Sequence, residues 1–267
     1  MLALIAGQGR LPGLLAAALE RGGRAFTVAE LDGFPAEGMG AHPVRRFRLE
    51  HLGTLLRDLV ADGATEVCLA GAVRRPAVDP AAVDAATAPL VPRILAALHS
   101  GDDGALRALV AIFEDAGLRV VGASDIAPEL LLEAGVPTHA QPQPVHTSDA
   151  DRAAAVLAAL APLDVGQGCV VSRGQVLAIE ALPGTDWMLS SLAAGHDGPR
   201  GGLFFKAPKS AQDRRFDLPA IGVQTVQGAA AAGLDGIVIE AGGVLVLDPE
   251  AVIAEADARG LFLWVRR

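Results

Sequence analysis

The sequence contains no tyrosine, and aromatic residues make up only 4% of its 267 residues. A chain so poor in aromatic side chains must fill its core with leucine, valine, isoleucine and alanine, and apolar residues do make up 51% of it. Aliphatic cores of this kind suit helices packed on sheets. The length allows one large or two medium domains. We therefore expect an α/β protein.

Cysteine is also scarce. Cys68 and Cys169 are far apart, and each lies in an apolar run. Two isolated thiols form neither a zinc site nor a disulfide framework, so we predict two buried thiols, as in a protein of a reducing cytoplasm. The six histidines are scattered without an H-x-x-x-H pair, and we expect ordinary surface or core roles for them.

Long apolar runs and a basic leader are absent as well. No run approaches the roughly 18 residues of a membrane-spanning helix, and the first residues lack the pattern of a signal peptide. We expect a cytoplasmic protein that contacts the inner membrane at most transiently and peripherally, without inserting into it. Basic residues are outnumbered, with a net charge of −9, which argues against a broad surface for nucleic acid.

Strand patterns alternate with helix patterns along the chain, which predicts a parallel sheet covered on both faces. We assign residues 1–132 to an N-terminal Rossmann-like domain. Residues 133–148, which are rich in proline, form a predicted linker. Residues 149–267 form a second α/β domain with mixed strands, in which Ser148 caps a helix over 150–160 and Arg173-Gly174 turns a hairpin.

Gly7-Gln8-Gly9 follows the first strand and is a candidate phosphate loop, because glycines let backbone N–H groups approach an anion. With Gly13 the spacing is G-x-G-x-x-x-G, which differs from the dinucleotide fingerprint. Glu30 ends the second strand, where a ribose-binding acid would stand. The residues alone leave open a phosphate loop, an NAD(P)-dependent oxidoreductase and a plain tight turn.

Charged residues mark a second candidate site. Lys206 and Lys209 can offset phosphate charge, and Asp217, between two apolar residues, can hold a divalent ion or orient water. Carboxylates at strand ends and helix starts suit Mg²⁺, which prefers oxygen ligands. We predict metal ligands at Asp217, Glu180, Asp186 and Glu240. Instead of binding metal, these residues can belong to solvated loops or can be acids that stabilise a helix dipole. The helix-dipole alternative also applies to Asp102.

Short motifs across the chain together resemble the LpxI-type UDP-2,3-diacylglucosamine pyrophosphatases. They are Leu4-Ile-Ala-Gly-Gln-Gly9, Ala70-Gly-Ala-Val-Arg-Arg-Pro76, Gly101-Asp-Asp103, Leu163-Asp-Val-Gly-Gln-Gly168, Glu180 with Gly184-Thr-Asp186, Lys206-Ala-Pro-Lys209, Asp217-Leu-Pro-Ala-Ile-Gly222 and Gly233-Leu-Asp-Gly-Ile-Val238. The motifs occur in order over essentially the whole chain. Ala72 departs from the asparagine of some relatives, which weakens any role for a side-chain amide there.

The resemblance implies hydrolysis of UDP-2,3-diacylglucosamine to UMP and 2,3-diacylglucosamine 1-phosphate (lipid X) in lipid A biosynthesis, with Mg²⁺ or Mn²⁺ and with substrate between two domains. Asp217 matches the essential aspartate of the family and is our candidate catalytic residue. The residues that we expect to contact substrate are Gly7, Gln8, Gly9, Gly71, Asp102, Gln167, Gly168, Thr185, Lys206, Lys209 and Gly222.

Two other functions stay open at this stage. One is the NAD(P)-dependent oxidoreductase, and the other is a non-catalytic protein that binds a nucleotide sugar or a lipid. A homodimer is an assembly that the sequence allows.

Overall fold

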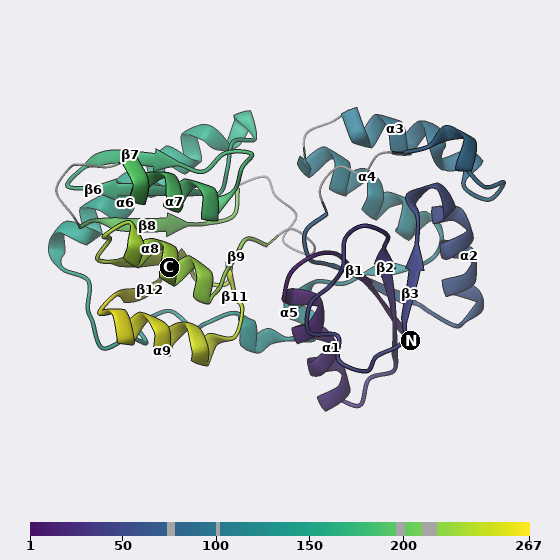
Figure 1. The fold of residues 1–267 in the computed structure, drawn as a ribbon, viewed down its shortest axis with the longest axis horizontal. Coiled ribbons are helices and arrows are strands. Elements are labelled where there is room, and N and C mark those ends of the chain that lie inside the picture. Colours follow the sequence, from purple (N-terminus) through teal and green to yellow (C-terminus); the bar gives the residue numbers. More distant parts are fainter. Residues whose placement is uncertain (74–77, 100–101, 196–200, 210–217) are drawn as a thin grey trace. The chain divides into compact units, whose positions relative to one another are not determined.

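The computed structural model describes residues 1–73, 78–99, 102–195, 201–209 and 218–267. The chain divides into two compact units, Met1–Pro128 and Glu129–Arg267 (Figure 1). The stretch 133–148, predicted as a linker, falls within the second unit. In the described residues no helix is both long and apolar enough to cross a membrane.

The described strands of the N-terminal unit form one parallel sheet in the order β3-β2-β1-β4-β5. The strands are β1 (Leu2–Ala6), β2 (Phe26–Leu31), β3 (Val44–Phe47), β4 (Glu66–Ala70) and β5 (Arg119–Val120). The chain steps outward from β1 to β3 and then crosses to β4 on the other side, as in a Rossmann sheet. The predicted fold of this part is confirmed.

The described helices between these strands are α1 (Leu11–Arg21), α2 (Leu52–Ala61), α3 (Val91–His99) and α4 (Asp102–Asp115), with 3-10 turns at Leu49–His51, Pro80–Ala82 and Ala88–Leu90. Helix α5 (Ala123–Ile126) and a 3-10 turn at Pro128–Leu130 follow β5. In Figure 1, α1 lies beside α5 and α3 lies beside α4. All five residues of β1 are buried, as expected for a strand covered on both faces.

The edge strand β3 carries little of the apolar pattern that predicts a strand. Its middle residues, Arg45 and Arg46, are exposed, and its outer residues are only half-buried. Charged side chains on an edge strand keep the sheet from pairing with other chains, and they also remove the apolar signal by which a strand is recognised.

The C-terminal unit contains a mixed sheet in the order β12-β10-β8-β6-β7, with β8, β10 and β12 parallel and β6 antiparallel to both neighbours. Its strands are β6 (Gly168–Ser172), β7 (Gln175–Ile179), β8 (Leu203–Lys206), β10 (Gly236–Glu240) and β12 (Phe262–Arg266). A separate parallel pair joins β9 (Ala220–Ile221) and β11 (Leu245–Val246). The predicted mixed strands and the hairpin at Arg173-Gly174 are confirmed.

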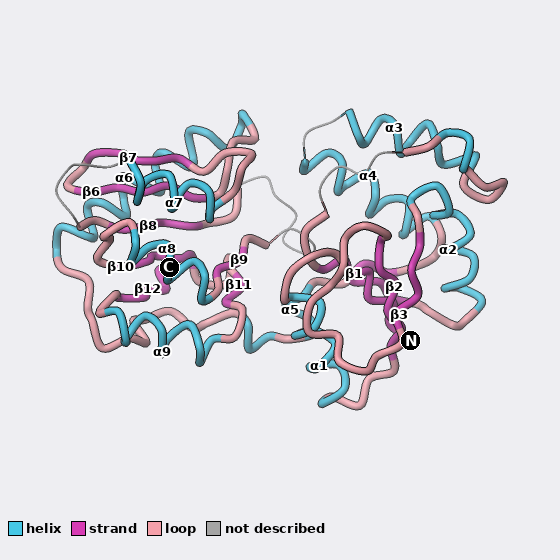
Figure 2. The backbone as a smooth tube through the Cα atoms, viewed as in Figure 1, coloured by secondary structure: helices cyan, strands magenta, loops and turns pink. Residues whose placement is uncertain are grey.

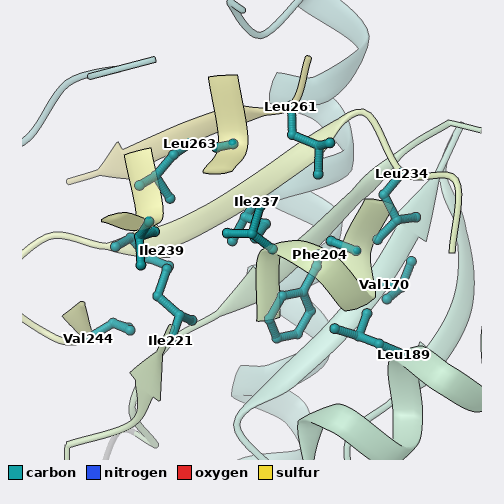
Figure 3. Packing of buried hydrophobic residues seen from close by; sticks show 14 of the residues in the cluster. Val170, Leu189, Phe204, Ile221, Leu234, Ile237, Ile239, Val244, Leu261 and Leu263 are labelled. Atoms are coloured by element: carbon teal, nitrogen blue, oxygen red, sulfur yellow. The ribbon is translucent and has the colours of Figure 1, made fainter. Parts of the chain in front are cut away.

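Helices cover both faces of this mixed sheet. One face packs on α6 (Pro144–Leu160), and the other on α7 (Thr185–Gly195), α8 (Val223–Ala231) and α9 (Pro249–Arg259). Along β8, Phe204 enters the core beneath α7 to α9, whereas Leu203 and Phe205 enter the core beneath α6. Figure 3 shows Phe204 with Val170, Ile237 and Leu189 in the first of these cores.

Helix α6 begins six residues earlier than predicted, so the prediction that Ser148 caps it is wrong. Pro144 takes the first position of the helix, where a missing N–H costs nothing. The Gln143 N–H donates to His146 Nδ1 (2.9 Å), which closes the helix end. The loop before α6 also packs within the unit (Figure 2), since Gly135 pairs with Val265 and the Leu263 N–H donates to Thr138 Oγ1 (2.9 Å).

Both cysteines are buried and free, as predicted. Burial raises the pKa of the Cys68 thiol and of the Cys169 thiol to about 12, so both stay protonated at neutral pH. Neither thiol has the character of a nucleophile.

Candidate functional site

Several predicted site residues lie along the side of the C-terminal mixed sheet at which its parallel strands end, and we call this side the site edge. Strands β8 and β10 end there at Lys206 and Glu240, and β7 ends there just before Glu180. Strand β6 runs the opposite way and begins there at Gly168, which is paired with Lys206. Ligands of α/β proteins commonly bind outside the carboxyl ends of parallel strands. Sheet geometry thus makes this edge the candidate site.

Lys206, Thr185 and Glu180 form a hydrogen-bonded chain at this edge. Lys206 Nζ donates to Thr185 Oγ1 (2.6 Å), and Thr185 Oγ1 donates to Glu180 Oε1 (2.9 Å). Lys206 Nζ lies 3.8 Å from the same carboxylate oxygen. Because Thr185 is the first residue of α7, its hydroxyl ties the start of that helix to the ends of β7 and β8. We name these three residues the Lys206 cluster.

Burial shapes the electrostatics of the Lys206 cluster. Lys206 is only 6% exposed and Glu180 only 9%. Burial lowers the pKa of Lys206 below its usual value, and the nearby carboxylates of Glu180 and Asp186 oppose that change. The second oxygen of Glu180, Oε2, is buried and has no hydrogen-bond partner among the described residues. A buried carboxylate oxygen without a partner is costly, so this atom is the strongest candidate for a bond to a ligand.

Two glycines make room for the Glu180 side of the cluster. Gly166 has a positive φ of 53°, and a Cβ there would lie 1.9 Å from the Glu180 carbonyl oxygen. A Cβ on Gly168 would lie 2.8 Å from Glu180 Oε2 and 2.6 Å from the Phe204 ring. Gly168, an expected substrate contact, therefore lies beside the cluster, and Gly166 is a further residue on which the geometry of the cluster depends.

The other predicted residues of this unit are engaged in local contacts. Lys209 forms an ion pair with Asp164. The Gln167 carbonyl accepts a bond from the Ala207 N–H (3.0 Å), and the Gly222 N–H donates to Thr225 Oγ1 (3.2 Å) at the start of α8. Asp217, the predicted catalytic residue, lies outside the described residues, as does the side chain of Asp102.

The fit of the candidate ligands to a divalent ion is partial. Within the described ranges, no group of three or more His, Cys, Asp or Glu side chains could hold a metal ion. Glu180 Oε2 is a hard oxygen donor without a partner, which fits Mg²⁺ or Mn²⁺. Magnesium is usually held by one or two carboxylates, with water and substrate phosphates as its remaining ligands. Glu180 is therefore the described residue that fits a metal best.

The glycine loop of the N-terminal unit is bonded to a second loop. The N–H groups of Gly7 and Gln8 donate to the carbonyls of Ala70 (2.8 Å) and Ala72 (2.9 Å). Gly71 has a φ of 90°, and a Cβ there would meet the carbonyl oxygens of Gly7 and Gln8 at 2.7 Å. In this conformation the N–H groups of Gly7 and Gln8 already have backbone acceptors, and the contact with phosphate that the sequence suggests for this loop stays a prediction.

The positions that a dinucleotide would need are also taken. Glu30 is buried and accepts a bond from the Ala36 N–H (2.9 Å), while Arg46 lies 3.3 Å from its other oxygen. A Cβ on Gly13 would lie 2.4 Å from the Glu37 carbonyl oxygen. The chain after β2 thus packs on the first turn of α1 and uses the acid that would bind ribose. This arrangement speaks against the oxidoreductase alternative.

Comparison with known proteins agrees with these features. The model of the LpxI N-terminal domain matches residues 1–130, and the model of the LpxI C-terminal domain matches residues 133–264. The sequence is 42% identical over 268 residues to the UDP-2,3-diacylglucosamine pyrophosphatase LpxI of Caulobacter vibrioides. That alignment covers 98% of this chain and 96% of the relative.

Proposed function

The chain belongs to the LpxI family, and from this premise we propose that it hydrolyses the pyrophosphate of UDP-2,3-diacylglucosamine. The products would be UMP and 2,3-diacylglucosamine 1-phosphate, in lipid A biosynthesis. The observation that carries the proposal is the 42% identity to a pyrophosphatase over 98% of the chain. Two features at the end of the parallel strands support it: Lys206 is buried with its Nζ 3.8 Å from Glu180 Oε1, and the other oxygen of that carboxylate, Oε2, has no hydrogen-bond partner among the described residues.

We propose the following roles for the residues of the site. Lys206 offsets charge on the pyrophosphate, and Thr185 holds its ammonium in place. A water oxygen bonds to one phosphorus while the bond from that phosphorus to the bridging oxygen breaks, and the bridging oxygen leaves with the other phosphate. The proton of that water passes to Asp217 or, if Asp217 binds metal instead, to solvent. Removing charge repulsion at the reacting phosphate is the largest contribution that such a site can make.

We also propose a divalent cation, Mg²⁺ or Mn²⁺. When bound, it would neutralise charge that develops on the phosphate oxygens. Glu180 is the first candidate ligand, because Oε2 has no partner among the described residues. Asp186, Glu240 and Asp217 remain candidates for the other protein ligands.

The remaining parts of the proposal concern the setting of the reaction. We propose that residues of both units contribute to binding the substrate. We further propose that the protein works in the cytoplasm and contacts the inner membrane peripherally, because its substrate would be a lipid. A homodimer belongs to the same set of proposals.

The test is a phosphorus NMR assay on UDP-2,3-diacylglucosamine with purified protein. We expect the pyrophosphate signals to be replaced by those of UMP and a sugar 1-phosphate, and heat-inactivated protein serves as the control. Binding of the substrate without release of UMP would instead favour the non-catalytic binding protein. Enhanced NADH fluorescence on addition of the protein would favour the oxidoreductase.

A further inference from the structure

A groove of about 640 Å³ lies between α7 and α8 in the C-terminal unit. The two helices pack side by side (Figure 1). Residues spaced three or four apart line the groove, as expected for one face of each helix: Asp186, Ser190, Ala193 and Ala194 from α7, and Gln224, Gly228 and Ala231 from α8.

One end of the groove adjoins the Lys206 cluster. Asp186 follows Thr185 in the first turn of α7, and its charge acts on Lys206. Gln224 lies in the first turn of α8, whereas Ala194 and Ala231 lie in the last turns. At 1.5 Å per residue, the groove extends roughly 12 Å along α7 from Asp186 to Ala194. It therefore leads away from the site edge along the helices.

The walls change in chemistry along this path. Asp186, Ser190 and Gln224 are polar and lie toward the site, while the far part is lined by alanine and glycine. A Cβ on Gly228 would lie 3.1 Å from Leu189 Cδ1, so the missing side chain lets α8 approach the apolar surface of α7. A groove that is polar near a phosphate site and apolar beyond it suits a ligand with a charged head and a hydrocarbon tail.

Exposed apolar side chains surround the same end of α7. Trp187 is 58% exposed in the first turn, and Leu182 is 92% exposed in the turn that precedes the helix. Both side chains add apolar surface beside the end of the groove that adjoins the Lys206 cluster. A tryptophan is well suited to the boundary between an apolar tail and water.

We propose that the groove between α7 and α8 binds an acyl chain of the lipid substrate, with the pyrophosphate at the Lys206 end. The proposal rests on the proposed function, which supplies a substrate with a charged head and acyl chains. The position of Asp186 carries it, because this residue lines the groove and directly follows Thr185 of the Lys206 cluster. A molecule with a charged head and an acyl tail can therefore reach both.

Tryptophan fluorescence gives a test that does not depend on turnover. The sequence has two tryptophans, so Trp264→Phe leaves Trp187 as the sole reporter. We expect 2,3-diacylglucosamine 1-phosphate with brominated acyl chains to quench Trp187 emission, and the deacylated sugar phosphate to leave it unchanged. Quenching that is equal for both compounds, or absent for both, overturns the proposal.

A kinetic test uses Ala193→Phe, which fills the groove, and Ala254→Phe as the matched control. Both alanines are exposed on helices of the same unit, but Ala254 lies on α9. We measure kcat/KM for the long-chain substrate and for an analogue with acetyl groups. Ala193→Phe should lower the ratio of the two values about tenfold, which corresponds to about 1.4 kcal/mol, and Ala254→Phe should not change it.

An unchanged ratio in Ala193→Phe, at a melting temperature near that of the parent, overturns the acyl-chain proposal while the enzyme is still active. Failure of the parent protein to release UMP from either substrate overturns the proposed function instead. The two failures are thus distinguishable, and the fluorescence test stays informative in both cases.

Discussion

Lys206 and Glu180 form a buried pair of opposite charges, and burial disfavours the charged form of each side chain. A buried ion pair contributes little net stability, but the loss of one partner leaves the other charge buried and uncompensated. At the scale of single residues, the question is whether Lys206 serves only the fold or also binds phosphate.

Removing the Lys206 side chain should lower both stability and activity. A second substitution, at its partner Glu180, should restore the stability but not the activity. We expect Lys206→Met to lower the free energy of unfolding by about 3–5 kcal/mol, because Glu180 loses its counter-charge. Adding Glu180→Gln should recover most of that loss. If Lys206 binds phosphate, UMP release in the double variant should stay well below that of Glu180→Gln alone, which is the reference because Glu180 is itself a candidate metal ligand. Recovery of turnover together with stability would show a structural role only.

The lowered pKa of Lys206 predicts a pH dependence. Between its folded and unfolded pKa values, the unfolded chain binds more protons than the folded one, so the contribution of Lys206 to stability rises with pH there. Turnover should fall in the same alkaline range, as the ammonium loses its charge. Urea unfolding and kcat/KM across this range check both trends, and the parent should differ from Lys206→Met in the stability trend.

Asp217 is tested by a variant that separates catalysis from folding. If it is the catalytic carboxylate, Asp217→Ala should lower kcat by at least about 10³-fold, or about 4 kcal/mol, at a nearly unchanged melting temperature. Asp213→Ala, four residues earlier in the sequence, is the matched control and should keep its activity. Turnover within about tenfold of the parent would rule out this role for Asp217.

At the scale of elements, close contacts between loops and helix starts organise the N-terminal unit. The loop after β2 packs on α1, and the loop after β4 is bonded to the loop after β1. The glycines that suggest a phosphate loop in the sequence therefore allow the backbone of one loop to lie against the backbone of another segment. Their spacing serves packing, which explains why it departs from the dinucleotide fingerprint.

The contact at Gly13 can be tested within α1. In an open helix, Gly→Ala would stabilise by about 1 kcal/mol. At Gly13 we expect the opposite, a loss of roughly 1–3 kcal/mol, because the new Cβ would overlap the Glu37 carbonyl. Gly22→Ala is the control, since its Cβ would lie 3.4 Å from the Ala18 oxygen. Chemical unfolding measures both, and a stabilised Gly13→Ala would contradict the contact.

At the scale of the whole molecule, the proposed reaction depends on a cation that the protein and the pyrophosphate would bind together. We expect EDTA to abolish UMP release and Mg²⁺ or Mn²⁺ to restore it, because phosphate oxygens and Glu180 Oε2 are suitable oxygen ligands. The melting temperature in EDTA is the control for unfolding. Full turnover in EDTA after extensive dialysis would remove metal from the mechanism.

The sequence by itself determined the features that arise from local patterns. The strands expected before Gly7 and up to Glu30 are present in the structure, and the alternation of strand and helix patterns predicted the α/β class. The turn at Arg173-Gly174 also followed from local residue preferences. Order of motifs along the chain carried the family resemblance, which the comparisons confirm.

Only the tertiary structure decided which residues meet. Thr185 and Lys206 were both expected at the site, but 21 residues separate their hydrogen-bonded atoms, and no local pattern reveals that bond. The edge strand β3 exists because β2 pairs with it, since its own residues carry little apolar signal. Glu30 likewise looked like a ribose ligand until the fold placed the Ala36 N–H beside it. Hydrogen bonds and close packing depend on positions in space, which residues distant in sequence acquire only when the chain folds.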